Sequence, residues 1–210
     1  MSPVTTTSSL EGVVLAGGYS TRFGDTEKAV ADLAGVPMIR RVVDHLATLT
    51  DAVVVNCRDE QLEAIQTALS DHDVEIRYAT DPVPDRGPLA GIQVGLEAVE
   101  REYGAVVACD MPFVEPALFE QLYAHARGHD GAVVRLEDGW YQPTQAVYRA
   151  ESMARACKET LGSDDTRILA AFETLDVITV EEAALEGVSA TTFESIDTPD
   201  DLQRAAHRLE

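Results

Sequence analysis

Positively charged residues are scarce in this sequence. Lysine occurs only as Lys28 and Lys158, and 16 Lys and Arg residues stand against 37 Asp and Glu residues, so that the formal net charge is −21 at pH 7. A surface this acidic repels the phosphate backbones of nucleic acids. Nucleic acid is therefore not expected as a partner.

Cysteine and long apolar runs are also sparse. Cys57, Cys109 and Cys157 lie far apart, are odd in number and include no CxxC pair, which argues against a disulfide framework or a zinc site. The five histidines show no metal-ligand spacing. No run approaches the ~18 consecutive apolar residues of a membrane-spanning helix, so no membrane contact is expected. We expect a protein of the reducing cytoplasm.

The chain length bounds the domain organisation. With 210 residues and 45% hydrophobic composition, the chain is expected to form one large globular domain. Residues 1–10 lack the basic start and apolar stretch of a secretory signal and are predicted to be a flexible tail. Residues 11–210 contain no internal repeat or convincing linker and are predicted to form the domain.

The spacing of apolar residues predicts the secondary structure. In the first half, strands are predicted at residues 13–16, 52–55, 74–79 and 104–109, and helices from residue 37 and at 62–69, 89–101 and 115–127. The less regular second half predicts strands at 132–136, 145–148 and 177–180 and helices at 151–161, 166–172 and from about 199. The predicted fold class is α/β: a single-domain, Rossmann-like, doubly wound and mostly parallel sheet with an irregular C-terminal extension.

A glycine-rich segment, residues 15–28 (LAGGYSTRFGDTEK), follows the first predicted strand. Its paired glycines let the backbone turn tightly and point amide N–H groups at phosphate oxygens, while Arg22 and Lys28 add mobile positive charge. The spacing fits neither the GxGxxG of dinucleotide-binding folds nor the GxxxxGK[ST] of phosphate-binding loops. A flexible turn is the alternative, but the presence here of one of only two lysines favours a phosphate site.

Further polar residues follow the predicted strands. In open α/β sheets ligands bind beyond the carboxyl ends of the strands, where Asp110 could hold a hard cation, although an Asp there is also a common turn former. Asn56 and Asp81 could hydrogen-bond to a base or ribose, or be turn residues. Gly87 opens a predicted helix whose free N–H groups could receive a phosphate, although Gly-Pro is also an ordinary helix start.

The glycine-rich segment resembles the signature LAGGxSxRMGxxxK of the nucleotidyltransferases related to the molybdenum cofactor guanylyltransferase. Phe23 stands where Met is usual and Glu27 where Asp is usual. The resemblance covers residues 11–206 and continues in GVPM from residue 35, Asp81 with GPLAGI from 87, CDMPF from 109, QP at 142, Tyr148 and IDTPDDL from 196.

This resemblance implies a fold of the nucleotide-diphospho-sugar transferase type and a Mg²⁺-dependent site. Arg22, Lys28 and Asp110 are the expected catalytic residues. Asp110 is implied as the magnesium ligand, and Asp197 is a second candidate ligand by analogy with related transferases, although this family often carries Asn there. The residues expected to bind the substrates are Leu15, Ala16, Gly17, Gly18, Lys28, Asn56, Asp81, Gly87 and Asp110.

The implied reaction transfers GMP from GTP to the terminal phosphate of molybdopterin and releases pyrophosphate. GTP and molybdopterin are then the small-molecule partners, and transient contact with molybdoenzyme maturation proteins is a further expectation. The loop does not separate this reaction from cytidylyl transfer to molybdopterin or from guanylyl transfer to a cobinamide or phospholactate precursor. A non-catalytic nucleotide or pterin carrier is the alternative from a different class, and the missing GxGxxG disfavours a nicotinamide oxidoreductase.

The excess of acid, with arginine preferred to lysine, is typical of proteins from extreme halophiles. We predict that folding and activity require molar salt, because screening relieves the repulsion among crowded carboxylates. Thermal unfolding and enzymatic rate measured in dilute buffer and in molar KCl test this prediction. Equal stability and activity in both would refute the halophilic interpretation.

Overall fold

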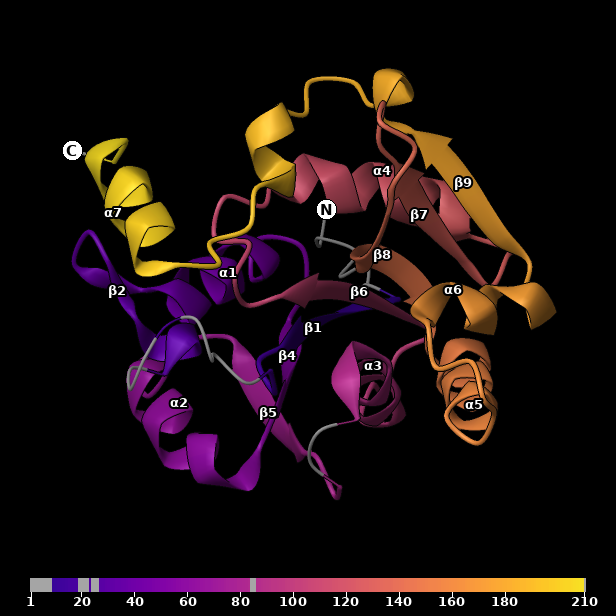
Figure 1. Cartoon of the computed structure of the whole chain (residues 1–210), viewed down its shortest axis with the longest axis horizontal. Helices are drawn as coiled ribbons and strands as arrows, with labels where there is room; N and C mark the ends of the chain where they lie inside the picture. The colour runs from indigo at the N-terminus through magenta and orange to yellow at the C-terminus, as the bar shows by residue number, and fades with distance from the viewer. Residues whose placement is uncertain (1–8, 19–22, 24–26, 84–85, 210) are drawn as a thin grey trace, which may run out of the picture.

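The computed structural model describes residues 9–18, 23, 27–83 and 86–209. At its centre is a seven-stranded sheet (Figure 1). From one edge to the other, the strands are β5 (Glu75–Thr80), β4 (Ala52–Cys57), β1 (Leu10–Leu15), β6 (Tyr103–Ala108), β8 (Tyr141–Arg149), β7 (Gly131–Arg135) and β9 (Val177–Glu181).

The strands share one direction with a single exception. β1 pairs in parallel with β4 and β6, β4 with β5, and β7 with β9, whereas β8 is antiparallel to both of its neighbours. The carboxyl ends of β1, β4, β5 and β6 therefore lie along one edge of the sheet. The prediction of a mostly parallel sheet is confirmed.

Helices cover both faces of the sheet, because neighbouring strand residues point to opposite sides. Val14 packs with residues of α1 (Met38–Leu46), α2 (Leu62–Ala68) and α4 (Pro116–Ala126). Val13 packs in a separate core with α3 (Gly87–Glu97), α5 (Ala150–Thr160) and α6 (Ile168–Ala171). The same alternation recurs along β4, β6 and β7, and it explains their nearly continuous apolar sequences.

The C-terminal helix α7 (Pro199–His207) belongs to a third, smaller core. It packs beside a short hairpin, β2 (Asp32–Leu33) and β3 (Val36–Pro37), that follows the glycine-rich segment. Leu33 and Met38 contribute to this core from the first half of the chain, and Ile196 and Ala205 from its end. The C-terminal segment is thereby brought back to the region of the glycine-rich segment.

The structure corrects the predicted elements in three places. Leu10, assigned to the tail, is the first residue of β1 and is buried, because it pairs with Tyr103 and packs in the core; residues 1–8 lie outside the described part. β8 begins at Tyr141, whereas the predicted strand began at residue 145; the sequence does not indicate the earlier start, because the first residues of β8 are only half-buried and show no apolar alternation. The hairpin β2–β3 was not predicted, because two-residue strands leave no periodic pattern.

The second half of the chain is more regular than expected as far as β9, since β7, β8 and β9 extend the same sheet. Beyond Glu181 it becomes irregular up to α7. In the described part of the chain, no helix is long and apolar enough to cross a membrane.

Candidate active site

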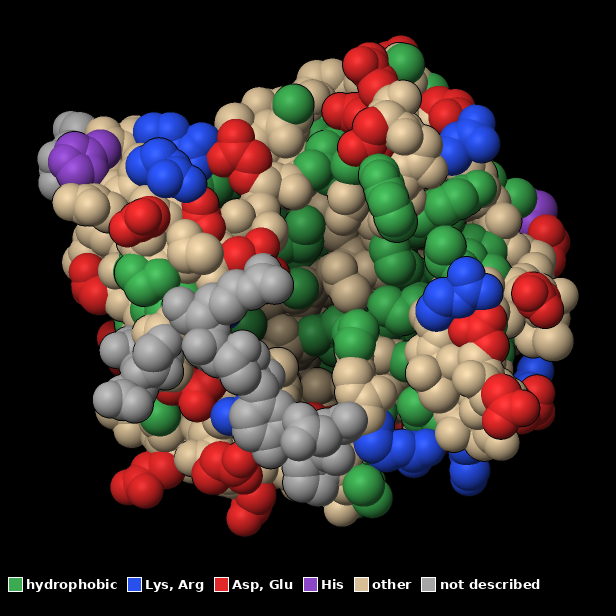
Figure 2. Space-filling model, in the orientation of Figure 1, with side chains coloured by type: hydrophobic (Ala, Val, Ile, Leu, Met, Phe, Trp, Pro, Cys, Tyr) green, Lys and Arg blue, Asp and Glu red, His purple; other side chains and the backbone are tan. Residues whose placement is uncertain are grey.

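A cavity of about 570 Å³ opens at the carboxyl ends of β1, β4, β5 and β6. The space-filling view shows the molecule hollowed at the centre of this face, over β6 and beside α3 (Figure 2). The predicted site residues that line the cavity are Leu15, Ala16, Gly17, Gly18, Lys28, Asn56, Asp81, Gly87, Asp110 and Asp197. Arg22, also predicted, lies outside the described residues.

The side chain of Lys28 lies between two carboxylates. Its Nζ is 2.8 Å from Asp110 Oδ2 and 2.8 Å from Asp197 Oδ1. Burial disfavours the charged ammonium, but the charges and hydrogen bonds of Asp110 and Asp197 outweigh it and hold the pKa of Lys28 above its ordinary value. Lys28 is therefore a cation throughout the neutral range, in a chain that has few cations.

Backbone pairing places Asp197 beside Asp110, although 87 residues separate them in sequence. The amide of Ile196 donates to the carbonyl oxygen of Asp110 at 2.8 Å. Immediately afterwards, Thr198 caps the N-terminus of α7 by accepting a hydrogen bond from the Asp201 amide. Asp197 is thus fixed between a main-chain hydrogen bond and a helix start, and Ser195 Oγ donates to its Oδ2 at 2.6 Å.

Asp110 and Asp197 form a pair that fits a magnesium ion. Both contact the same Nζ, so their oxygens converge on a position that one cation can occupy. In the part of the chain that the structure describes, no group of three or more His, Cys, Asp or Glu residues is arranged to hold a metal. Mg²⁺ accepts such a site, since it commonly binds one or two carboxylates and takes its other ligands from water and substrate phosphates.

Asn56 and Asp81 form the other side of the cavity. Asn56 Nδ2 donates to Asp81 Oδ1 at 2.6 Å and to the Ala79 carbonyl at 3.2 Å. Burial raises the pKa of Asp81 above its ordinary value, although the hydrogen bond from Asn56 and the charge of Arg58 oppose this shift. Glycine leaves room for this pair, because a Cβ on Gly17 would lie 2.4 Å from Asp81 Oδ2 and one on Gly91 2.6 Å from Asn56 Oδ1, so that either would displace these side chains.

The start of α3 forms the floor of the cavity next to this pair. Gly87, with a φ of +73°, begins the helix, and the side chain of its N-cap residue, Arg86, makes no capping hydrogen bond. Gly87, Pro88, Ala90 and Gly91 all line the cavity. The first amides of α3 and the positive end of its dipole are therefore available to an anionic group.

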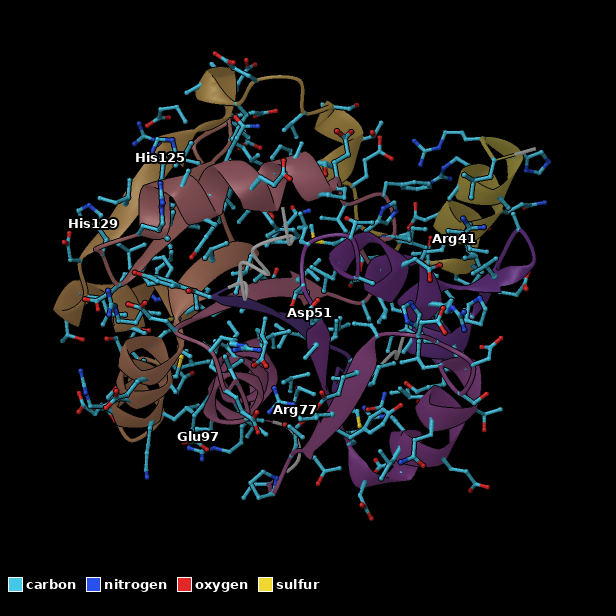
Figure 3. All side chains as sticks on the ribbon, turned by 180° about the vertical axis from the view of Figure 1, so that it is seen from behind. Arg41, Asp51, Arg77, Glu97, His125 and His129 are labelled. Carbon is cyan, nitrogen blue, oxygen red and sulfur yellow. The ribbon has the colours of Figure 1, made fainter. Side chains whose placement is uncertain are left out.

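None of the described residues that line the cavity is a histidine. His125 lies on α4 and His129 in the turn after it (Figure 3). His129 is paired with Asp176, and His72 with Asp44.

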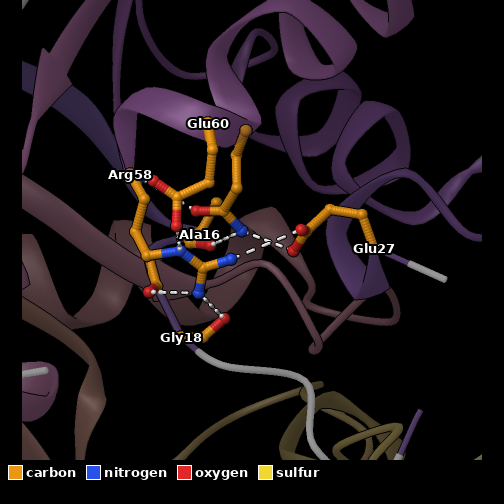
Figure 4. Close-up of polar contacts among 7 residues, drawn as sticks. Ala16, Gly18, Glu27, Arg58 and Glu60 are labelled. Atoms are coloured by element: carbon orange, nitrogen blue, oxygen red, sulfur yellow. Dashed lines mark hydrogen bonds and ion pairs between the residues drawn. The ribbon is translucent and has the colours of Figure 1, made fainter. Parts of the chain in front are cut away.

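Four polar side chains at the site were missed by the sequence analysis. Arg86 and Thr144 line the cavity, and Arg58 and Gln61 contact the glycine-rich segment from its other side (Figure 4). Two of them left a signal: each arginine follows a strand end by a few residues in an acidic chain. Thr144 left none, because the part of β8 that contains it shows no apolar alternation.

Comparison with known proteins identifies the family of this chain. Residues 12–177 match the sequence model of the MobA-like NTP transferase domain. A probable molybdenum cofactor guanylyltransferase from the halophilic archaeon Natronomonas pharaonis is 50% identical over 199 residues, which are 94% of this chain and 97% of the relative. A protein of the same description from Haloferax mediterranei is 33% identical over 198 residues, covering 94% and 93%.

Solved structures agree with the sequence comparison. Molybdopterin-guanine dinucleotide biosynthesis protein A from Archaeoglobus fulgidus superposes with a TM-score of 0.76 at 28% identity, covering 95% of this chain and 98% of that one. A 4-diphosphocytidyl-2C-methyl-D-erythritol synthase from Anaerococcus prevotii shares the fold, with a TM-score of 0.73 at 16% identity and coverage of 95% and 97%. The resemblance in the glycine-rich segment is confirmed, and the chain belongs to the MobA-like NTP transferase family.

Proposed function

We propose that this chain transfers GMP from GTP to the terminal phosphate of molybdopterin, giving molybdopterin guanine dinucleotide and pyrophosphate. The observation that carries the proposal is the position of Lys28 between Asp110 and Asp197, beside a glycine-rich turn at the strand ends. Phosphate groups and a divalent cation are the ligands that such a site accepts. The names of the relatives from Natronomonas pharaonis and Haloferax mediterranei support a guanine nucleotide and the molybdenum cofactor as the substrates.

The triphosphate of GTP binds at residues 15–18 in this proposal. The amides of Gly17 and Gly18 lie at the cavity and provide neutral donors to phosphate oxygens. Lys28 adds a positive charge that neutralises the triphosphate. Arg22 is proposed as a second cation on the basis of the sequence motif.

The guanine nucleoside is proposed to bind at Asn56 and Asp81. Guanine carries hydrogen-bond donors, including its exocyclic amino group, and the Asp81 carboxylate is an acceptor at the cavity wall. Asn56 orients this carboxylate through the bond to Oδ1, which leaves Oδ2 for a further contact. The terminal phosphate of molybdopterin is proposed to bind at the N-terminus of α3, close to Arg86.

Asp110 and Asp197 would hold Mg²⁺, with Lys28 turning from the carboxylates to the phosphates. When bound, this ion supplies a positive charge that stabilises the charge developing on the transferred phosphoryl group and the pyrophosphate. The residues of the chain position the two substrates so that the acceptor phosphate faces the α-phosphorus of GTP.

No protein nucleophile takes part in this reaction. Cys109 lines the cavity, but burial and the neighbouring Asp110 charge raise the pKa of its thiol, so it stays protonated and weakly nucleophilic at neutral pH. The acceptor phosphate of molybdopterin is itself the attacking group. Rate acceleration then comes from orientation and charge neutralisation.

We place this activity in the cytoplasm, because Cys57, Cys109 and Cys157 are all buried and unpaired. Transient contact with molybdoenzyme maturation proteins is also proposed, because the product of the proposed reaction is a form of the molybdenum cofactor.

Nucleotide selectivity tests the proposed reaction. The purified protein is incubated with Mg²⁺, molybdopterin and one of GTP, CTP, ATP or UTP, and pyrophosphate release is measured together with the dinucleotide product. We expect release with GTP and formation of molybdopterin guanine dinucleotide. Preferred use of CTP would assign cytidylyl transfer instead, and nucleotide binding without pyrophosphate release by any of the four would indicate a carrier.

Substitution of the central residues tests the site. We expect Lys28→Ala and Asp110→Ala each to lower the rate of pyrophosphate release on the order of 10²-fold or more, because each removes a charge that acts on the reacting phosphates. Lys158→Ala and Asp164→Ala are matched controls, since both residues are exposed and lie outside the cavity. Near-normal rates for Lys28→Ala or Asp110→Ala, in protein whose thermal unfolding is unchanged, would refute the site assignment.

A further inference from the structure

Two buried polar side chains contact the glycine-rich turn on the side away from the cavity. Arg58 and Gln61 lie in the turn that follows β4 and are 6% and 1% exposed. The motif shared with the family includes neither residue, because both lie in a different part of the sequence from the glycines that they contact.

Their hydrogen bonds reach three successive carbonyl groups (Figure 4). Gln61 Nε2 donates to the Ala16 carbonyl at 3.0 Å. Arg58 Nη1 donates to the carbonyls of Gly17 at 3.2 Å and Gly18 at 3.0 Å. Every backbone acceptor from Ala16 to Gly18 is therefore bonded on one side of the turn.

This pattern determines where the amide groups point. In a planar trans peptide the N–H lies opposite the C=O of the preceding residue. The carbonyls of Ala16 and Gly17 face Gln61 and Arg58, so the amides of Gly17 and Gly18 face the other way. Within the described chain these two amides have no hydrogen-bond acceptor. Consecutive amides directed to one side form a site for an anion.

The same two side chains also contact the far end of the glycine-rich segment. Arg58 Nη2 is 3.4 Å from Glu27 Oε2, and Gln61 Nε2 donates to Glu27 Oε1. Glu27 directly precedes Lys28, whose ammonium contacts Asp110 and Asp197. Arg58 and Gln61 thus join the turn at Ala16–Gly18 to the position from which Lys28 extends.

We propose that Arg58, together with Gln61, is a positioning residue for the polyphosphate of the nucleotide. It contacts no phosphate itself; it fixes the carbonyls of the turn so that the amides of Gly17 and Gly18 are preorganised, and it fixes Glu27 so that Lys28 extends over the same phosphates. This inference rests on the proposed nucleotidyl transfer and assigns a function to a residue outside the shared motif.

A purely structural role for Arg58 predicts a different result. If Arg58 served only the stability of the fold, its substitution would weaken the binding of all ligands of the cavity equally, or would weaken the binding of none. If it positions the turn, the loss falls on the β- and γ-phosphates, because Asn56 and Asp81 receive the nucleoside elsewhere in the cavity. The ratio of the dissociation constants of GMP and GTP separates these roles.

Calorimetric titration of GTP and of GMP, with Mg²⁺ and at the salt concentration that keeps the wild type folded, measures this ratio. Arg58→Lys retains the charge opposite Glu27 but lacks the planar fork that reaches two carbonyls. We expect Arg58→Lys and Arg58→Ala to raise the Kd of GTP by about tenfold to 100-fold, while the Kd of GMP stays close to its wild-type value. In the transfer assay, KM for GTP should rise more than kcat falls. If Arg58→Ala does not fold, Arg58→Lys carries the test.

Arg77→Lys is the matched control. Like Arg58, Arg77 donates to a carbonyl, that of Ala98 at 2.7 Å, and to a carboxylate, that of Glu11 at 2.6 Å, but it lies outside the cavity (labelled in Figure 3). We expect it to lower the melting temperature without changing the GMP to GTP ratio.

Two results would overturn the inference in distinguishable ways. In the first, the wild type binds GTP more tightly than GMP, but Arg58→Lys leaves both Kd values unchanged or raises both by the same factor. This result contradicts the positioning role alone. A wild type that binds no nucleoside triphosphate contradicts the proposed function as well.

Discussion

The contact of one ammonium group with two carboxylates organises this site. Lys28 follows the glycine-rich turn, Asp110 follows β6, and Asp197 comes from the C-terminal segment, yet Nζ lies 2.8 Å from an oxygen of each acid. Two neighbouring carboxylates repel each other unless a cation lies between them. Lys28 supplies that cation when no metal is bound, and the residues that place these three groups are therefore the ones on which the site depends.

The placement follows from the sheet and from the small third core. β1 and β6 are neighbours, so the residues that follow them emerge at the same edge. The hydrogen bond from Ile196 to Asp110, with the packing of Ile196 and Ala205 against Leu33 and Met38, brings the chain end to this edge. A chain with a formal charge of −21 can in this way bind anionic substrates, because local cations and amides act where salt screens the remote carboxylates.

Much of this arrangement can be predicted from the sequence, because it depends on which residues follow the strands of a mostly parallel sheet. The spacing of apolar residues identifies β1, β4, β5 and β6, and polar residues at their ends gather wherever parallel strands lie side by side. The antiparallel direction of β8 and the hairpin β2–β3 cannot be predicted in this way, since direction and two-residue strands leave no periodic pattern. The contacts of Arg58 and Gln61 with the glycine-rich turn also escape prediction, because they are made to backbone carbonyls that any residue provides. Arg22 stays a prediction from the motif.

The most direct test of the central claim is a crystal structure of the protein with Mg²⁺ and a GTP analogue that cannot transfer its nucleotidyl group. We expect the triphosphate at the amides of Gly17 and Gly18, the ion on Asp110 and Asp197, and Lys28 Nζ on a phosphate oxygen instead of between the two carboxylates. A nucleotide bound outside this cavity, or an ion that contacts neither Asp110 nor Asp197, would contradict the account.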